Sequence, residues 1–523
     1  MSEHAVVRTE FLGGSPLSRA ARNGDLRQWY RSAPADGEQW TQYVRDVAAS
    51  VSDDWFASLR SAIAPKGAAL TRLSASAGGK GVVITTGQQP GLFGGPLMTL
   101  VKAISARALA DVIGERTGMP VAPLFWAATD DADFDEAAVV SVALEGGPRE
   151  LRLEQRAPAG TPMARVAIDR EIDIHAAVLR DACRSSPHRS YLEAALSAFR
   201  DGETVGDAYT TLLRSILEPL EIAVLDASHP EVIRRASPLL RKAAANGEDV
   251  ASAAHRRIEE IIGASYKPQV EEVPGLSMVF LNANGTKRRL PLGEAAALAD
   301  SRDAVLSPTV LLRPVIERAI VPTAAYVAGP GEFAYFAQVS AVAERLGVPT
   351  PFVVPRWSAT IVEPRVQHIL NEFGLTVEDL SDPHAADSRV ARSRVSPETT
   401  RAMQTLRDDL RSGMETLRRS NGRAVPDRAL DGLQRAIEHR LERTERRFIA
   451  AVKRAEVDAM RQLATARGSL FPHGTRQERK LAYIPFLAKY GPELLDEMLA
   501  GAREHAKALV ETSAEQASPV ASR

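Results

Sequence analysis

Apolar runs that alternate with glycine-rich turns and helical patterns constrain the fold of this chain most. A short apolar run at residues 82–84 leads into a glycine-rich segment at 85–96, a helical pattern at 97–113 and a second apolar run at 121–128. Strand, turn, helix and strand in this order predict a βαβ unit of a parallel sheet. Ligands bind at the carboxyl ends of strands in open α/β sheets, and both of these runs end in polar residues.

The glycine-rich segment has two interpretations that the residues alone leave open. Its glycines would let a ligand approach the backbone closely, and N–H groups at the start of the next helix would suit a phosphate or carboxylate. Lys102, one to two turns into that helix, would add a positive charge. The alternative is a tight turn that only connects strand and helix. The segment matches neither G-x-x-x-x-G-K-[ST] nor G-x-G-x-x-G, so no standard nucleotide fingerprint is met.

An acidic cluster follows the second apolar run directly. Like charges this close repel one another and raise some pKa values unless a cation or a donor offsets them. Such a cluster could hold Mg²⁺, hold the amine of a substrate or supply a general base. The alternative is a solvated loop or the first turn of a helix, where acids are favoured by the dipole. We favour a functional role because the strand aims these groups at the sheet edge: Asp130, Asp131, Asp133, Asp135 and Glu136.

A second unit of the same kind occurs more than 200 residues later. An apolar run at 323–328 meets Gly329-Pro330-Gly331-Glu332, then a helical pattern to about 346 and a third run at 352–354. Two such units would complete one parallel sheet, with the site where the halves meet. Arg313 and Arg356 flank this unit. Each could clamp a carboxylate or phosphate, or could form a salt bridge with the acidic loop, and the residues do not decide between these.

The region 396–467 predicts a helical hairpin. Apolar positions recur there at near-heptad spacing, which is typical of a coiled coil, and Ser420-Asn421-Gly422 with Pro426 separates two helices. The alternative is a pair of long helices packed on the main body. The predicted fold is therefore α/β, a Rossmann-like parallel-sheet core split by an inserted α+β connecting domain, plus a C-terminal α-helical coiled coil. The predicted segments are 1–148 and 301–390 for the two halves of the core, 149–300 for the insertion, 391–467 for the coiled coil, and 468–523 for a loop and helix returning to the core.

The bulk composition excludes several classes of protein. The 523 residues are 45% hydrophobic and 25% charged, with a net charge of −1, which argues against nucleic acid as the main partner. The single cysteine, Cys183, excludes an intrachain disulfide framework, and the scattered histidines lack metal-ligand spacing. We expect no fixed metal site and no membrane span. A cytoplasmic location follows because the N-terminus has no signal-peptide pattern.

Taken together, these motifs resemble the bacillithiol-biosynthesis cysteine-adding enzyme family, BshC. They run over nearly the whole chain in the family's order, and no single one is specific alone. The residues that carry the resemblance are Thr86-Gly87-Gln88-Gln89-Pro90-Gly91, Gly95-Pro96-Leu97, Lys102, Phe125-Trp126, Asp130-Asp131-Ala132-Asp133-Phe134-Asp135-Glu136, Gly329-Pro330-Gly331-Glu332, Ala334-Tyr335, Pro355-Arg356, Leu470-Phe471-Pro472, Gln477-Glu478-Arg479 and Lys489-Tyr490-Gly491-Pro492.

The resemblance implies a ligase that forms a C–N amide bond between L-cysteine and glucosaminyl-malate, the last step of bacillithiol synthesis. It also implies a homodimer through the coiled coil and, through a distant likeness to class I aminoacyl-tRNA synthetases, the use of a nucleotide. ATP is the expected activating agent, and Mg²⁺ is a candidate companion. One position departs from the family, which has Glu-Asp-His-Asp where this chain has Asp130-Asp131-Ala132-Asp133. An acid–base role of that histidine therefore does not transfer.

We expect Asp131 and Asp133 to hold the cysteine ammonium or a metal, and Asp131, Asp133 and Glu136 to be the catalytic residues. Lys102 and the two arginines would neutralise carboxylate or phosphate charge. Two alternatives stay open, a non-catalytic coiled-coil adaptor with a degenerate site and an adenylate-forming ligase for another amino acid or amine. The expected substrate- or nucleotide-binding residues are Thr86, Gly87, Gln88, Gln89, Gly91, Gly95, Lys102, Trp126, Arg313, Gly329, Gly331, Glu332, Tyr335 and Arg356.

Overall fold

The structure is a computed structural model, and the residues that it describes are 4–155, 157–420, 422 and 424–516. These residues form two compact units. The larger unit contains the sheet and comprises 4–142, 150–361 and 478–516. The smaller unit is mainly helical and comprises 143–149 and 362–477, except for the undescribed positions.

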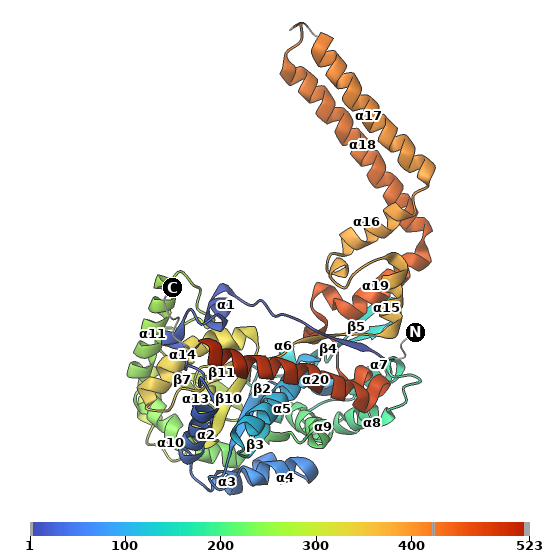
Figure 1. Cartoon of the computed structure of the whole chain (residues 1–523). Helices are drawn as coiled ribbons and strands as arrows, with labels where there is room; N and C mark the ends of the chain where they lie inside the picture. Colours follow the sequence, from blue (N-terminus) through green and yellow to red (C-terminus); the bar gives the residue numbers. More distant parts are fainter. Residues whose placement is uncertain (1–3, 156, 421, 423, 517–523) are drawn as a thin grey trace. The chain divides into compact units, whose positions relative to one another are not determined.

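A five-stranded parallel sheet forms the centre of the larger unit (Figure 1). Its order, β11-β10-β2-β3-β6, is the 3-2-1-4-5 order of a Rossmann-like sheet when the strands are numbered along the chain. Both βαβ units predicted from the sequence are confirmed. They join because β10 pairs in parallel with β2, with Tyr326 opposite Thr85. The strands are β2 (Val82–Gln88), β3 (Val121–Ala127), β6 (Ala223–Asp226), β10 (Thr323–Ala328) and β11 (Val353–Pro355).

The sheet strands are apolar in continuous runs because helices cover both faces of the sheet. One face packs on a large core that includes Trp55 and Leu59 of α3, Leu240 of α10 and Phe336 of α14. Helix α5 contacts β2 and β3 and packs in turn on α2 and α20. The bounds are α2 (Gly37–Ala49), α3 (Trp55–Ile63), α5 (Met98–Thr117), α9 (Val205–Leu217), α10 (Pro230–Ala245), α13 (Arg313–Ile320), α14 (Pro330–Leu346) and α20 (Ile484–Gln516).

The range predicted as an inserted domain contributes to the central sheet as well as to a second sheet. Strand β6 lies within 149–300 and pairs in parallel with β3. The second sheet has the order β8-β7-β9 and is antiparallel. The turn between β7 and β8 lies at Asn284-Gly285, where both residues adopt positive φ, as an Asn-Gly pair in a hairpin favours. These strands are β7 (Leu276–Ala283), β8 (Thr286–Pro291) and β9 (Val305–Pro308).

Further elements complete the larger unit. Strand β1 pairs with β12, and β4 pairs with β5. No helix among the described residues combines the length and apolar character needed to cross a bilayer. The bounds are β1 (Val6–Thr9), α1 (Pro16–Arg22), α4 (Gly67–Ala75), α6 (Phe134–Ala137), β4 (Val139–Leu144), β5 (Gly147–Arg152), α7 (Ile172–Ala182), α8 (Arg189–Ala198), α11 (Gly247–Gly263), α12 (Leu292–Leu298) and β12 (Ala359–Val362).

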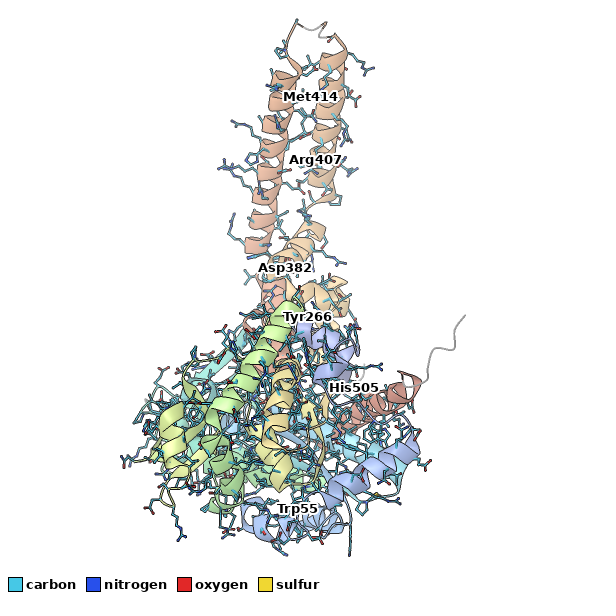
Figure 2. The ribbon with its side chains drawn as sticks, turned by 90° about the vertical axis from the view of Figure 1, so that its left-hand side faces the viewer. Trp55, Tyr266, Asp382, Arg407, Met414 and His505 are labelled. Atoms are coloured by element: carbon cyan, nitrogen blue, oxygen red, sulfur yellow. The ribbon has the colours of Figure 1, made fainter. Side chains whose placement is uncertain are left out.

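The smaller unit contains the predicted helical hairpin. Helices α17 and α18 run antiparallel, because Arg418 pairs with Asp431 while Arg407 pairs with Glu445 (Figures 1 and 2). Met414 is buried between them, whereas the large apolar Phe448 is 42% exposed. Dimerisation through this hairpin stays a prediction. The bounds are α15 (Pro364–Phe373), α16 (Pro383–Ser393), α17 (Pro397–Ser420), α18 (Asp427–Ala455) and α19 (Val457–Leu470).

The C-terminal segment of the larger unit meets the end of the sheet through a buried ion pair. Arg356, directly after β11, donates two hydrogen bonds to the carboxylate of Glu478, at 2.8 and 2.6 Å. Ser358 donates a third to the same carboxylate, at 2.8 Å. Arg356 and Glu478 are 0% and 2% exposed in their side chains, so each charge depends on the other for compensation.

Replacing one partner of this pair should destabilise the larger unit strongly. We expect Arg356→Ala to cost about 3–5 kcal/mol, because it leaves a buried carboxylate without its cation. The midpoint of urea unfolding, followed by tryptophan fluorescence, measures the loss. The double variant Arg356→Met, Glu478→Leu should lie nearer the wild type than Arg356→Ala does. Equal midpoints for Arg356→Ala and the wild type would contradict a structural role for the pair.

Candidate active site

A cavity of about 640 Å³ opens where β2 and β10, the first strands of the two halves, lie side by side. Strand order reverses at this point, and ligands of open α/β sheets bind at such positions. Both glycine-rich turns contribute to its wall, Gly87 and Gln88 from the first and Gly329 and Gly331 from the second. The predicted meeting of two distant turns around one hollow is therefore confirmed.

Lys102 connects the two turns. Its ammonium donates to the Gly87 carbonyl at 2.7 Å and to Gln88 Oε1 at 3.0 Å, and forms an ion pair with Glu332 at 2.6 Å. An ammonium has three donors, so these contacts use all of them. Burial lowers the pKa of Lys102, and the Glu332 carboxylate opposes this change. Lys102 thus positions the turns and has no donor left for a ligand.

Glu332 is the matching anion at the start of α14. Its carboxylate accepts from the Gly329 N–H at 2.9 Å and from the Tyr326 hydroxyl at 2.8 Å, in addition to Lys102. Burial alone would raise the pKa of Glu332, but the charge and hydrogen bond of Lys102 outweigh it, and the pKa is lowered. The carboxylate is therefore ionised at neutral pH and is a structural anion.

The polar network continues through Tyr326 to a second ion pair. The Tyr326 hydroxyl accepts from Arg313 Nη2 at 3.0 Å, and Arg313 Nη1 donates to Glu317 at 2.8 Å. Thr85 of β2 hydrogen-bonds Glu317 from the other side. Burial raises the pKa of Glu317, and the charge of Arg313 opposes the rise. Arg313 lines the cavity, and Glu317 rather than the acidic loop is its ion-pair partner.

The first glycine-rich segment closes mainly as a tight turn. A Cβ on Gly91 would lie 2.6 Å from the Cα of Gly95, so the two glycines allow the chain to fold back on itself. Beyond them, the Leu97 N–H donates to the Leu481 carbonyl at 2.7 Å. The backbone N–H groups at the start of α5 are thus partly hydrogen-bonded within the protein. Gly91 and Gly95 do not line the cavity. The Thr86 hydroxyl donates a hydrogen bond to the Val327 carbonyl at 2.9 Å.

The residues of the acidic loop have different roles. Asp130, Asp131 and Ala132 line the cavity, whereas Asp133 caps α6 by accepting from the Glu136 N–H at 3.1 Å. Asp133 therefore fits the alternative interpretation of the acidic cluster, in which an acid occupies the start of a helix. Glu136 lies outside the lining and hydrogen-bonds Gln89, and burial together with the charge of Asp133 raises its pKa.

Three further cationic side chains line the cavity. Lys287 and Arg289 of β8 were not predicted as site residues, whereas Arg479 belongs to the segment 477–479 that carries the family resemblance. Lys287 donates to the Asp130 carbonyl at 2.6 Å, and Arg289 Nε donates to the Ser277 carbonyl at 2.7 Å. Burial lowers the pKa of Arg289. Lys287 and Arg289 are only weakly indicated by their sequence context, because a basic run after a hairpin turn is usual for a solvated strand.

Among the remaining predicted residues, Gln89, Trp126 and Tyr335 line the cavity, and Arg356 does not, since it is committed to Glu478. The cations Lys287, Arg289, Arg313 and Arg479 fit carboxylate or phosphate groups. Within the described parts of the chain, no group of three or more His, Cys, Asp or Glu side chains could hold a metal ion.

The Lys102–Glu332 pair should make the stability of the larger unit depend on pH. The pKa of Glu332 is lowered from its usual 4.5, so its stabilising contribution is present above pH 4.5 and is lost as the pH falls further. Glu332→Gln should therefore lower the free energy of unfolding by about 2 kcal/mol at pH 7, and the difference from wild type should shrink below pH 4.5. Glu344→Gln, an exposed change on the same helix, is the matched control. A difference that is the same at pH 7 and pH 4 would contradict this role.

Comparison with known proteins identifies the family. The description "Bacillithiol biosynthesis BshC, N-terminal Rossmann-like domain" matches residues 20–357, and "Bacillithiol biosynthesis BshC, C-terminal coiled-coil domain" matches 359–508. Relatives named "Putative cysteine ligase BshC" include one from Solibacter usitatus, 32% identical over 450 residues that cover 82% of this chain and 83% of the relative. The relative from Salinibacter ruber is 29% identical, with 80% of each chain covered, and that from Symbiobacterium thermophilum is 28% identical, with 90% and 93% covered. The chain belongs to the bacillithiol biosynthesis BshC family.

Proposed function

We propose that this chain is a cysteine ligase of bacillithiol biosynthesis, which joins the carboxyl group of L-cysteine to the amine of glucosaminyl-malate. The observation that carries the proposal is the cavity at the strand-order reversal, which is lined by Asp131 and by cationic side chains. Cations suit the two carboxylates of a malyl group. The relatives named "Putative cysteine ligase BshC" support a ligase that acts on cysteine.

Formation of the amide requires that an oxygen leave the cysteine carboxyl group and that the neutral amine lose one of its two protons. ATP would make that oxygen part of a phosphate-containing leaving group. Mg²⁺ would come bound to the phosphates of ATP. Lys287, Arg289, Arg313 and Arg479 would hold the phosphate and carboxylate groups. Asp131 is the proposed proton acceptor, because it lines the cavity where the family histidine is replaced by Ala132. Its Oδ1 accepts from the Asp133 N–H at 2.9 Å, which fixes its orientation.

Thiol profiling of a strain that lacks this chain tests the proposal. Bacillithiol should be absent, glucosaminyl-malate should accumulate, and the intact chain should restore the thiol. Loss of a different amide product would indicate a ligase for another amino acid or amine. Unchanged thiols, together with no heat of ATP binding in calorimetry, would favour a non-catalytic coiled-coil adaptor.

Arg289→Gln should weaken binding of glucosaminyl-malate. Losing one charge-assisted hydrogen bond costs about 1.5–3 kcal/mol, which predicts a rise in KM for this substrate of roughly 10- to 100-fold. The KM for L-cysteine should change little. Arg288→Gln, the neighbouring strand residue that pairs with Glu294 outside the cavity, is the matched control. Equal KM values for Arg289→Gln and Arg288→Gln would contradict the assignment of Arg289 to the binding site.

A further inference from the structure

A second cavity of about 620 Å³ adjoins the first. It lies among α10, α13, β9 and the turn between β7 and β8, at the same edge of the sheet. Small-molecule sites have volumes of this size. The two cavities share the lining residues Trp126, Asp130, Pro308 and Arg313. A ligand held at this shared wall would reach both hollows.

Two polar groups of the shared wall make no hydrogen bond to another described residue. Trp126 is 3% exposed, and its indole Nε1 has no hydrogen-bond acceptor among the described residues. Asp130 is partly buried; Lys287 bonds its backbone carbonyl, and the charges of Lys287 and Arg313 act on its carboxylate. Arg313 is itself engaged with Glu317 and Tyr326. Buried polar groups are normally paired, so the unpaired indole N–H indicates a ligand that supplies an acceptor, and the Asp130 carboxylate in the same wall is available to a donor of that ligand.

The pair of groups is complementary to an amino acid. An α-ammonium supplies donors to a carboxylate, and an α-carboxylate supplies an acceptor to an indole N–H. Beyond the shared wall, the lining of the second cavity includes polar residues such as Arg165, Ser228 and Asn282, and a group of apolar side chains that suits a small apolar or thiol side chain. These are Val232, Ile233, Ala236 and Leu240 of α10 and Ile316 of α13.

We propose that Asp130 binds the α-ammonium and Trp126 the α-carboxylate of L-cysteine, and that the second cavity receives the thiol side chain. The proposal rests on the proposed function, and it assigns the amino acid to Asp130 and Trp126 instead of Asp131 and Asp133. The cysteine carboxyl carbon then lies at the junction of the two cavities. From there it faces the cation-lined hollow where the amine of the second substrate is held.

Calorimetric titration of the whole chain with L-cysteine and, separately, with glucosaminyl-malate tests the assignment. Asp130→Asn should weaken L-cysteine binding tenfold or more, because it removes the charge that an ammonium requires, and should leave glucosaminyl-malate binding unchanged. Asp135→Asn is the matched control, since Asp135 belongs to the same acidic cluster, in α6, and lines neither cavity. Circular dichroism confirms that each variant is folded.

A second variant probes the side-chain cavity alone. Ile233 is only partly buried, so Ile233→Trp fills the hollow with little cost to folding. It should also weaken L-cysteine binding tenfold or more. Wild-type affinity for L-cysteine in either folded variant would overturn the assignment and leave the proposed function intact. An equal loss for both ligands would overturn it as well. Failure of the wild-type chain to bind L-cysteine at all would overturn the proposed function itself.

Discussion

The ion pair between Lys102 and Glu332 is the contact on which the geometry of the site depends. Each partner comes from a different half of the sheet, and each is fully used, the ammonium by three acceptors and the carboxylate by three donors. Breaking a buried pair of this kind leaves an uncompensated charge, so the two turns are held at one separation. The contact thereby joins, at the wall of the cavity, two turns that the chain separates by more than 200 residues.

The sequence predicted those features that depend on local patterns. Continuous apolar runs identified β2, β3 and β10, because strands covered on both faces show no polar alternation. The turn at Asn284-Gly285 was predictable because few other residue pairs adopt two successive positive φ values. Their assembly into one sheet followed from the repetition of the βαβ pattern, since parallel strands must be joined by crossovers.

The roles of individual charges could not be predicted, because they depend on contacts between distant residues. Arg356 was a candidate ligand clamp, yet its partner is Glu478, 122 positions away. Lys102 was expected to neutralise a ligand, and its donors are instead used by the turns themselves. Asp133 differs from Asp131 only in its place relative to a short helix. A formal charge in a sequence therefore indicates a polar site, while only the fold shows which charges remain available to a ligand.

Gly87 illustrates how the strand register and the two cavities are related. It lies opposite Trp126 in the pairing of β2 with β3. A Cβ at position 87 would lie 3.1 Å from the Trp126 carbonyl oxygen and 3.5 Å from the Tyr326 hydroxyl, closer to the former than ordinary contacts allow. A larger residue would require the Trp126 backbone to move by a few tenths of an ångström, next to the hydroxyl that bridges Arg313 and Glu332. Glycine at this position is thus favoured by the packing of the shared wall itself, independently of any close approach of a phosphate.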